Sequence, residues 1–275
     1  MSAPTDQPPD HPLTDAALLK IVSAVHALAV AAAPRLRAPR DYTEHYALLL
    51  YFTLIECCGS VALLREQSRV AGVAAVVRSA LDAFVDIKNL LSDPEYWRSL
   101  EAADSYEWKK IMESASVPGN SFLDGLRIDP KFPEYRSMIS QNVANAAARG
   151  NTKLSPEERF ERANLRAEYK SLYPMLSADA HNNTSLLNSR HARPEGDGFV
   201  IELYSGSGAY GNSVLMTLSE LIMFASEDIH ERLGFGKGIV TEIRAIVEPA
   251  RRAAEAADRA ASGASAATRP EIGTD

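Results

Sequence analysis

The chain has 275 residues and a formal net charge of −7, with 36 acidic residues against 29 lysines and arginines. Hydrophobic residues make up 46% and charged residues 24%, which is ordinary for a globular protein and excludes a collagen-like, disulfide-stapled or wholly disordered chain. The acidic balance also argues against general nucleic-acid binding, although it allows a local basic face.

The two ends of the chain differ in composition from the rest. Residues 1–13 are acidic and proline-rich and lack the basic region of a secretory signal, while residues 261–275 are of low complexity. We therefore predict disordered ends and a single helical domain over 14–260. We expect a cytoplasmic protein, in which the adjacent Cys57 and Cys58 are reduced core thiols.

Helical periodicity recurs throughout this domain. Two stretches depart from it. Residues 115–134 are rich in turn formers and are predicted to be a lid or a partner-binding loop, and the sequence EGDGFVIELY predicts a β-hairpin near 190–205. The predicted fold class is all-α, a multi-helix bundle of about seven helices with a small β-hairpin insertion. The helical patterns cover 14–33, 42–68, 70–91, Ser92 to about Ser114, 135–148, 155–181, 213–233 and 238–260.

The stretch from Tyr46 to Leu64 comes nearest to a membrane span. Glu56 lies inside it, and an acidic residue at the centre of a bilayer costs about 2.5–3.5 kcal/mol on insertion scales. The flanks also lack aromatic or basic belts. We therefore predict a buried core helix at this position and no membrane association.

The first candidate site is a narrow polar stripe on the helix predicted over 70–91. Arg78, Asp82, Asp86 and Asn89 follow one another at intervals of four or three residues and fall within an arc of about 80°. Such a stripe either faces solvent or lines a cleft. In a cleft its charges must be paired.

The second candidate site lies on the helix predicted over 155–181. Tyr173, Ser177 and His181 follow one another at intervals of four residues, with Asn182 beside them. Histidine is the side chain whose ordinary pKa suits proton transfer near neutral pH. The alternative interpretation is a hydrogen-bonded cluster that only closes the end of the helix.

Glu56 gives the third signal, because a carboxylate buried among apolar residues needs a cation or donor, and Arg78 is the expected partner. If the three helices are neighbours, these side chains meet in one inter-helix pocket. We predict no metal and no cofactor, because metal-spaced cysteine pairs, a P-loop and a dinucleotide-binding motif are absent. The catalytic candidates are His181, Arg78, Asp82, Ser177 and Tyr173, and the ligand-binding candidates are Glu56, Asp86 and Asn182.

Two of these segments resemble a family of uncharacterised bacterial helical proteins, a domain of unknown function. Its members pair an Arg-x-x-x-acid helix with a later Tyr-x-x-Leu-Ser-x-x-x-His helix. Here the first motif is RSALDAFVDIKNL (78–90) and the second is YPMLSADAHN (173–182), and the resemblance covers roughly residues 40–232. The acidic position, usually Glu in the family, is Asp82. The resemblance implies a helical fold and a site, but no reaction.

A more distant similarity is to HEPN helical bundles, many of which are ribonucleases in toxin and phage-defence systems. Their motif is an arginine followed by a histidine after four to six intervening residues. Here only Arg40 and His45 have this spacing, and neither His181 nor His230 has the required arginine. The chain therefore departs from a standard HEPN ribonuclease, although not from the bundle.

Two functional hypotheses follow. The first is a binding or regulatory module, in which the polar pocket orders the bundle or grips a small or phosphorylated ligand through Arg78. The second is a HEPN-like hydrolase acting on RNA or a nucleotide, with His181 as acid or base and Arg78 steadying phosphate charge. The first is favoured, because no complete catalytic motif is present. Long apolar helices are also compatible with a homodimer.

Overall fold

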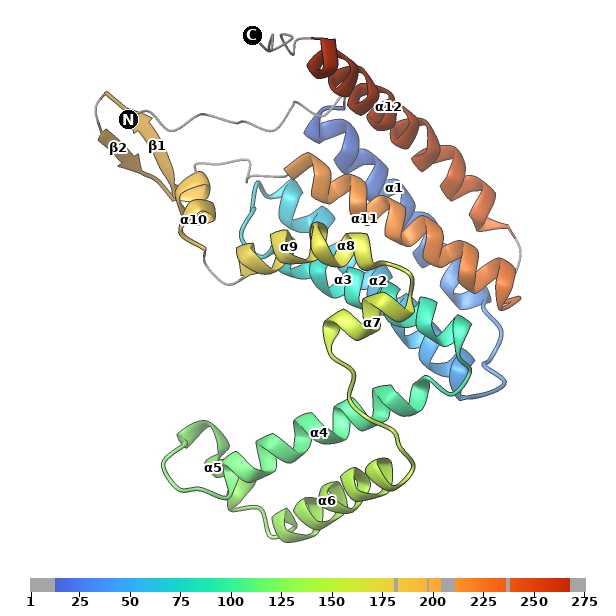
Figure 1. Cartoon of the computed structure of the whole chain (residues 1–275), viewed down its shortest axis with the longest axis vertical. Helices are drawn as coiled ribbons and strands as arrows, with labels where there is room; N and C mark the ends of the chain where they lie inside the picture. Colours follow the sequence, from blue (N-terminus) through green and yellow to red (C-terminus); the bar gives the residue numbers. More distant parts are fainter. Residues whose placement is uncertain (1–12, 181–182, 197, 204–210, 236–237, 268–275) are drawn as a thin grey trace, which may run out of the picture. The chain divides into compact units, whose positions relative to one another are not determined.

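The computed structural model describes residues 13–180, 183–196, 198–203, 211–235 and 238–267, and it is helical apart from one small sheet (Figure 1). The all-α class is confirmed, but the helices are shorter and more numerous than the predicted seven. The α-helices are α1 Asp15–Ala32, α2 Tyr42–Glu66, α3 Val73–Ser92, α4 Trp97–Ala115, α5 Asp124–Arg127, α6 Phe132–Ala148, α7 Pro156–Arg162, α8 Arg166–Lys170, α9 Leu172–Ala180, α10 Thr184–His191, α11 Gly211–Glu227 and α12 Ile239–Ala267.

The chain divides into two compact units. The prediction of one domain over 14–260 stays a prediction, and the units are described separately below. α12 runs on to Ala267, past the predicted boundary at 260, whereas nearly all of the predicted N-terminal arm lies outside the described residues. The larger unit comprises Met1–Ala38, Leu48–Phe84 and Lys170–Asp275, and the smaller unit comprises Pro39–Ala47 and Val85–Tyr169.

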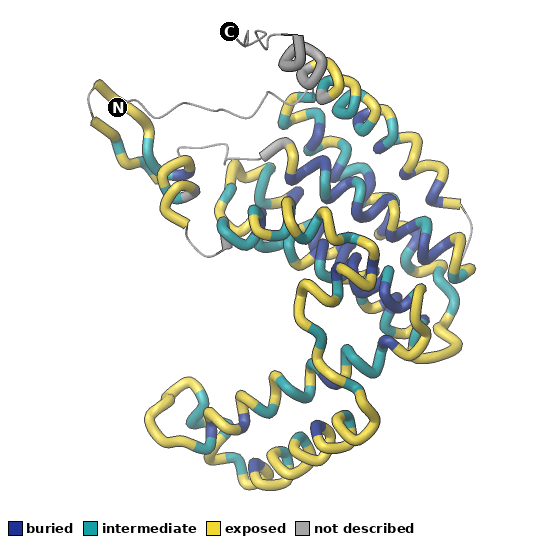
Figure 2. The backbone as a smooth tube through the Cα atoms, viewed as in Figure 1, coloured by how far each residue is buried: buried dark blue, intermediate teal, exposed yellow. Residues whose placement is uncertain are grey.

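In the larger unit, α1, α11 and α12 pack against one another, and Figure 2 shows buried residues along α11. On α1, Leu18, Val22 and Val25 are fully buried. Their spacing of four and three residues places them on one face of the helix, which is what an amphipathic helix needs in order to pack on a core. Leu215 and Leu218 on α11 are equally buried.

Local signals set several helix ends as predicted. The Ser155 side chain accepts a hydrogen bond from Glu158 N and the Glu158 carboxylate accepts one from Ser155 N, which makes a capping box at the start of α7. Gly150 follows α6 and Gly234 follows the π-helix η3 (Asp228–Arg232), both with positive φ. Only glycine adopts this conformation at little cost, so both positions end their helices.

The prediction of a single helix over 155–181 is wrong. The segment forms α7, α8 and α9, which are three short helices. The first break falls at Asn164, whose φ is 59°, while Leu165 N donates to the Phe160 carbonyl at 2.8 Å. Asparagine is one of the few non-glycine residues that accept this left-handed conformation, so it ends α7 as a glycine would.

The β-hairpin predicted near 190–205 is confirmed. Strand β1 (Ala192–Glu195) pairs antiparallel with β2 (Gly198–Ile201), in a register that places Ala192 opposite Ile201. The stretch 115–134 is more ordered than predicted, because it contains the 3₁₀ turn η2 (Ser121–Leu123) and α5.

In the smaller unit, α4 and α6 form an antiparallel pair. Met112 and Ala115, near the end of α4, share one buried cluster with Phe132, at the start of α6. Arg98, near the start of α4, and Arg149, just after α6, line one cavity. The pair therefore has an apolar end and a polar end. Leu123, Leu126 and Tyr135 cover the apolar cluster, which anchors the turn-rich connection.

Two segments, Asp15–Arg35 and Tyr42–Glu66, are long and apolar enough to cross a membrane, a test that buried core helices also pass. The predicted absence of membrane association and the cytoplasmic location stay predictions. Cys57 and Cys58 are free and buried, as predicted. Burial raises the pKa of the Cys58 thiol to about 12, so this thiol stays protonated and unreactive at neutral pH.

Candidate functional site

The structure joins two of the predicted motif helices in the larger unit. Arg78 on α3 donates from Nη2 to the Tyr173 hydroxyl on α9 at 2.7 Å, and its Cζ lies 4.7 Å from the centre of the Tyr173 ring. Ser177, one turn further along α9, donates its hydroxyl proton to the Tyr173 carbonyl at 2.7 Å. Asp82 lies one turn after Arg78 on α3 and is half-buried.

One other predicted site residue, Glu56, does not join this cluster. Glu56 is exposed on α2, so the expected buried carboxylate beside Arg78 is wrong. The reason is that α2 turns one face to solvent even though its sequence is apolar on nearly all sides: Leu49 and Leu63 are also exposed. His181 and Asn182 lie outside the described residues.

Asp86, on the same stripe as Arg78, is buried and forms an ion pair with the part-buried Arg159 in the smaller unit. Arg159 on α7 donates from Nε and Nη2 to its two carboxylate oxygens at 2.9 and 2.7 Å, and Tyr96 donates its hydroxyl at 2.6 Å. Asn89 donates to the Arg159 carbonyl at 3.0 Å. Burial raises the pKa of Asp86, although Arg159 and Tyr96 lower it. Both carboxylate oxygens are therefore engaged within the protein.

A buried polar group that the sequence did not reveal lies in the larger unit. The Tyr51 hydroxyl is 2.9 Å from Ser226 Oγ and 3.5 Å from His230 Nε2. Ser226 donates to the Ile222 carbonyl, so Tyr51 donates to Ser226. His230 lies in the π-helix η3 and is buried, and within the described chain its Nδ1 has no hydrogen-bond partner. Burial lowers the pKa of His230.

This lowered pKa predicts acid sensitivity. Below the ordinary histidine pKa of about 6.5 the unfolded chain binds a proton that folded His230 resists, so the free energy of unfolding falls as the pH drops through this value. We expect the melting temperature to fall less in His230→Gln than in the wild type between about pH 7.5 and pH 5.5. His45→Gln, at an exposed position, is the control and should behave as wild type. Equal falls in all three proteins would contradict the prediction.

The polar end of the α4–α6 pair contains a pocket of about 660 Å³. This volume lies within the range of small-molecule sites, about 300–1,000 Å³. On each helix four of the lining residues stand at positions i, i+3, i+4 and i+7, which is one helix face, and Leu100 and Asp104 of α4 line the pocket from outside this pattern. Ala102 and Ala146 occupy the i+4 positions, and their short side chains leave the space between the helices open. The side chains that line the pocket include Arg98, Glu101, Ala102 and Ser105 from α4, Asn142, Asn145 and Ala146 from α6, and Arg149 and Asn151 after it.

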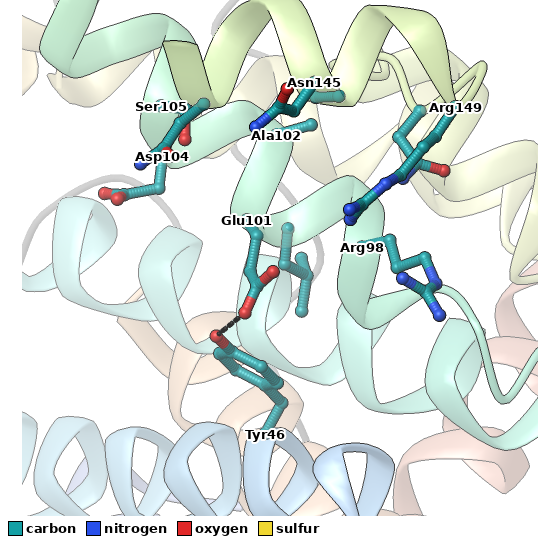
Figure 3. Close-up of a pocket in the computed structure, with 12 residues that line it drawn as sticks. Tyr46, Arg98, Glu101, Ala102, Asp104, Ser105, Asn145 and Arg149 are labelled. Carbon is teal, nitrogen blue, oxygen red and sulfur yellow. Dashed lines mark hydrogen bonds between the residues drawn. The ribbon is translucent and has the colours of Figure 1, made fainter. Parts of the chain in front are cut away.

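Charges are separated across this pocket. Figure 3 shows the guanidinium groups of Arg98 and Arg149 on one side and Asp104 on the other. Glu101 points toward Tyr46, and its Oε1 accepts a hydrogen bond from the Tyr46 hydroxyl, with 3.0 Å between the two oxygens. Burial and Glu101 raise the pKa of Tyr46 to about 12, so it remains a donor at neutral pH.

The two arginines differ in their partners. Arg98 forms an ion pair with Glu95 and lies over the Trp97 ring, with 4.4 Å from its Cζ to the ring centre. Glu95 is exposed and Arg98 is half-buried. Ion pairs near the surface contribute only about 0–1 kcal/mol, so a ligand can replace Glu95 at little cost. Arg149 is exposed, and its side chain has no ion-pair or hydrogen-bond partner among the residues that are described.

Sequence reasoning missed this pocket. The signal was present as two polar quartets, Arg98-Glu101-Ala102-Ser105 and Asn142-Asn145-Ala146-Arg149, each with helical spacing. Only the pairing of α4 with α6 shows that the quartets face one another. In the part of the chain that the structure describes, no group of three or more His, Cys, Asp or Glu side chains is placed to hold a metal ion.

Comparison with known proteins gives a family but no activity. The family of unknown function DUF5677 matches residues 44–199, more than half of the chain. The predicted resemblance to a domain of unknown function is therefore confirmed, over a shorter range than the predicted 40–232. No curated protein and no solved structure shows significant similarity to the chain.

Proposed function

Because the chain belongs to DUF5677, a family that carries no assigned activity, we propose from the geometry that it is a binding module whose α4–α6 pocket takes a small phosphate-bearing ligand. One observation carries the proposal: Arg98 and Arg149 bring two guanidinium groups to one side of a polar pocket. Guanidinium groups match the geometry of phosphate oxygens and bind them through charge-assisted hydrogen bonds.

The surroundings of the two arginines support the same ligand class. Asn142, Asn145 and Asn151 supply amide donors and acceptors along the pocket wall. Arg98 is the second residue of α4, so a bound anion lies near the positive end of that helix dipole. Phosphate is expected to bind weakly and with a marked dependence on salt, because the site is open to solvent.

The test is an NMR titration of ¹⁵N-labelled protein with methyl phosphate. We expect Nε–H signals of Arg98 and Arg149 to shift on titration, and Arg149→Gln to weaken binding about tenfold or more, as losing a charged hydrogen bond worth about 1.5–3 kcal/mol predicts. Arg136→Gln is the matched control, since Arg136 is an exposed arginine outside the pocket on α6, the helix that Arg149 follows. Equal affinity in Arg149→Gln and Arg136→Gln would contradict the proposal.

The alternative is the HEPN-like hydrolase that acts on RNA or a nucleotide. It is supported by the hydrogen bond between Arg78 and Tyr173, which links the two motif helices. In this alternative His181 transfers a proton and Arg78 steadies phosphate charge. A homodimer remains compatible with either proposal.

RNA cleavage assays separate the alternatives. If the hydrolase exists, His181→Ala should abolish cleavage of a single-stranded RNA oligomer, whereas His45→Ala, which removes the histidine of the Arg40–His45 spacing, should not. No cleavage by purified wild-type protein, or loss in His45→Ala alone, would contradict a site built on His181.

A further inference from the structure

A second cavity, of about 600 Å³, adjoins the pocket just described and is lined by Glu95, Arg98, Arg149 and Asn151. Three of these residues, Arg98, Arg149 and Asn151, also line the first pocket. Arg98 and Arg149 thus line both cavities. An anion held by them has room for a substituent on each of two sides.

This arrangement distinguishes two classes of phosphate. A phosphate monoester carries one substituent and fills one cavity, whereas a phosphodiester carries two and fills both. The first pocket is the richer of the two in carboxylates, because Glu101 and Asp104 line it and both are exposed. Carboxylates accept hydrogen bonds from an ammonium group and attract its charge. The second cavity offers Glu95 and the Asn151 amide, which suit hydroxyl groups.

Resting on the proposed function, we infer that the ligand is a zwitterionic phosphodiester. Its phosphate lies between Arg98 and Arg149, an amine-bearing arm reaches Glu101 and Asp104 in the first pocket, and a hydroxyl-bearing arm lies in the second cavity. Each charged group of the ligand then faces protein groups of opposite charge: the phosphate faces the two arginines, and the ammonium group faces the two carboxylates. A simple anion would bind only the arginine side of the pocket and would leave the carboxylates on the other side without a ligand group.

Affinity for four soluble probes tests the two arms separately. Glycerophosphoethanolamine has both the diester and the amine, glycerophosphoglycerol only the diester, phosphoethanolamine only the amine, and glycerol phosphate neither. A monoester carries more negative charge than a diester at neutral pH, so charge alone favours the monoesters at a pair of arginines. We expect the opposite order, with glycerophosphoethanolamine binding tightest, because only this probe places a fitting arm in each cavity.

Two variants assign the preference to the proposed residues. The double variant Glu101→Gln with Asp104→Asn should lose the preference for the amine, about threefold to tenfold for exposed charges, while it retains the preference for the diester. The Glu101→Gln change keeps a side-chain oxygen that can accept the hydrogen bond from the Tyr46 hydroxyl, so the fold of the pocket is preserved. Arg149→Gln should lower the affinity of the protein for all four probes.

The outcomes separate this inference from the proposed function. If the probes bind in an Arg149-dependent way but glycerol phosphate binds as tightly as glycerophosphoethanolamine, the zwitterionic diester is wrong and the phosphate site stands. If no probe binds, both fail. Flotation with phosphatidylethanolamine vesicles identifies the source: Arg149-dependent flotation assigns the diester to a lipid headgroup, and its absence, with binding of the soluble probe, assigns it to a free diester.

Discussion

Replacing Arg159 by methionine is expected to lower the free energy of unfolding of the smaller unit by about 3–5 kcal/mol. The cause is the carboxylate that remains. Asp86 is buried and accepts two of its hydrogen bonds from Arg159, so the variant leaves a buried charge whose only remaining hydrogen bond among those described above is that from Tyr96. Methionine fills much of the arginine volume, which keeps the loss of packing small.

Both tryptophans of the chain, Trp97 and Trp108, lie in the smaller unit, so their fluorescence during urea denaturation reports its stability. Arg162→Met is the matched control, because Arg162 is exposed on the same helix, and we expect a change within about 0.5 kcal/mol. The combined variant Asp86→Leu with Arg159→Met should recover part of the loss, since it removes the orphaned charge. A loss in Arg162→Met as large as in Arg159→Met would refute the argument.

The effect of Arg159→Met should also depend on pH. Burial already raises the pKa of Asp86, and removing Arg159 removes the largest interaction that lowers it. A carboxyl group with a raised pKa in the folded state binds its proton more readily when folded, so its contribution favours folding at low pH and is lost as the pH rises through that pKa. The difference in stability between wild type and variant should therefore be smaller near about pH 5 than near about pH 8.

The sequence predicted those parts of the fold that depend on neighbouring residues. The capping box of Ser155 and Glu158 and the glycine stop at Gly150 act within a few residues, so local pattern identified them. The break at Asn164 was missed, because asparagine occurs within helices as well as at their ends and only its backbone conformation distinguishes the two.

The candidate sites depended on pairing between distant segments, which periodicity does not give. The stripe Arg78–Asp82–Asp86 was correctly seen as polar, yet its members have different partners. Arg78 donates a hydrogen bond to Tyr173, in line with the expectation that the polar faces of the two helices meet. Asp86 pairs instead with Arg159, which has no distinguishing feature in the sequence. To find the α4–α6 pocket, two helices must be matched in register. Many helices of this chain have a similar polar face, so the sequence does not show which two of them pair.

Phe132→Ala tests whether that register creates the pocket. Phe132 is 8% exposed and packs with Met112 and Ala115, so its truncation should cost about 3–5 kcal/mol. This small cluster joins the end of α4 to the start of α6. Its loss should therefore weaken the pairing of the whole antiparallel pair and with it the alignment of Arg98 and Arg149. We expect lower protection of α6 amides from hydrogen exchange and weaker binding of methyl phosphate in the same variant.

The connection between the helices supplies a control of the same chemistry. Phe122 is 96% exposed in η2, so Phe122→Ala removes an identical side chain that packs on nothing and should change stability by no more than about 0.5 kcal/mol. If Phe132→Ala loses stability but binds methyl phosphate as wild type does, the pocket does not depend on the apolar end of the pair. If both properties fall together in Phe132→Ala and neither falls in Phe122→Ala, the apolar cluster positions the arginines.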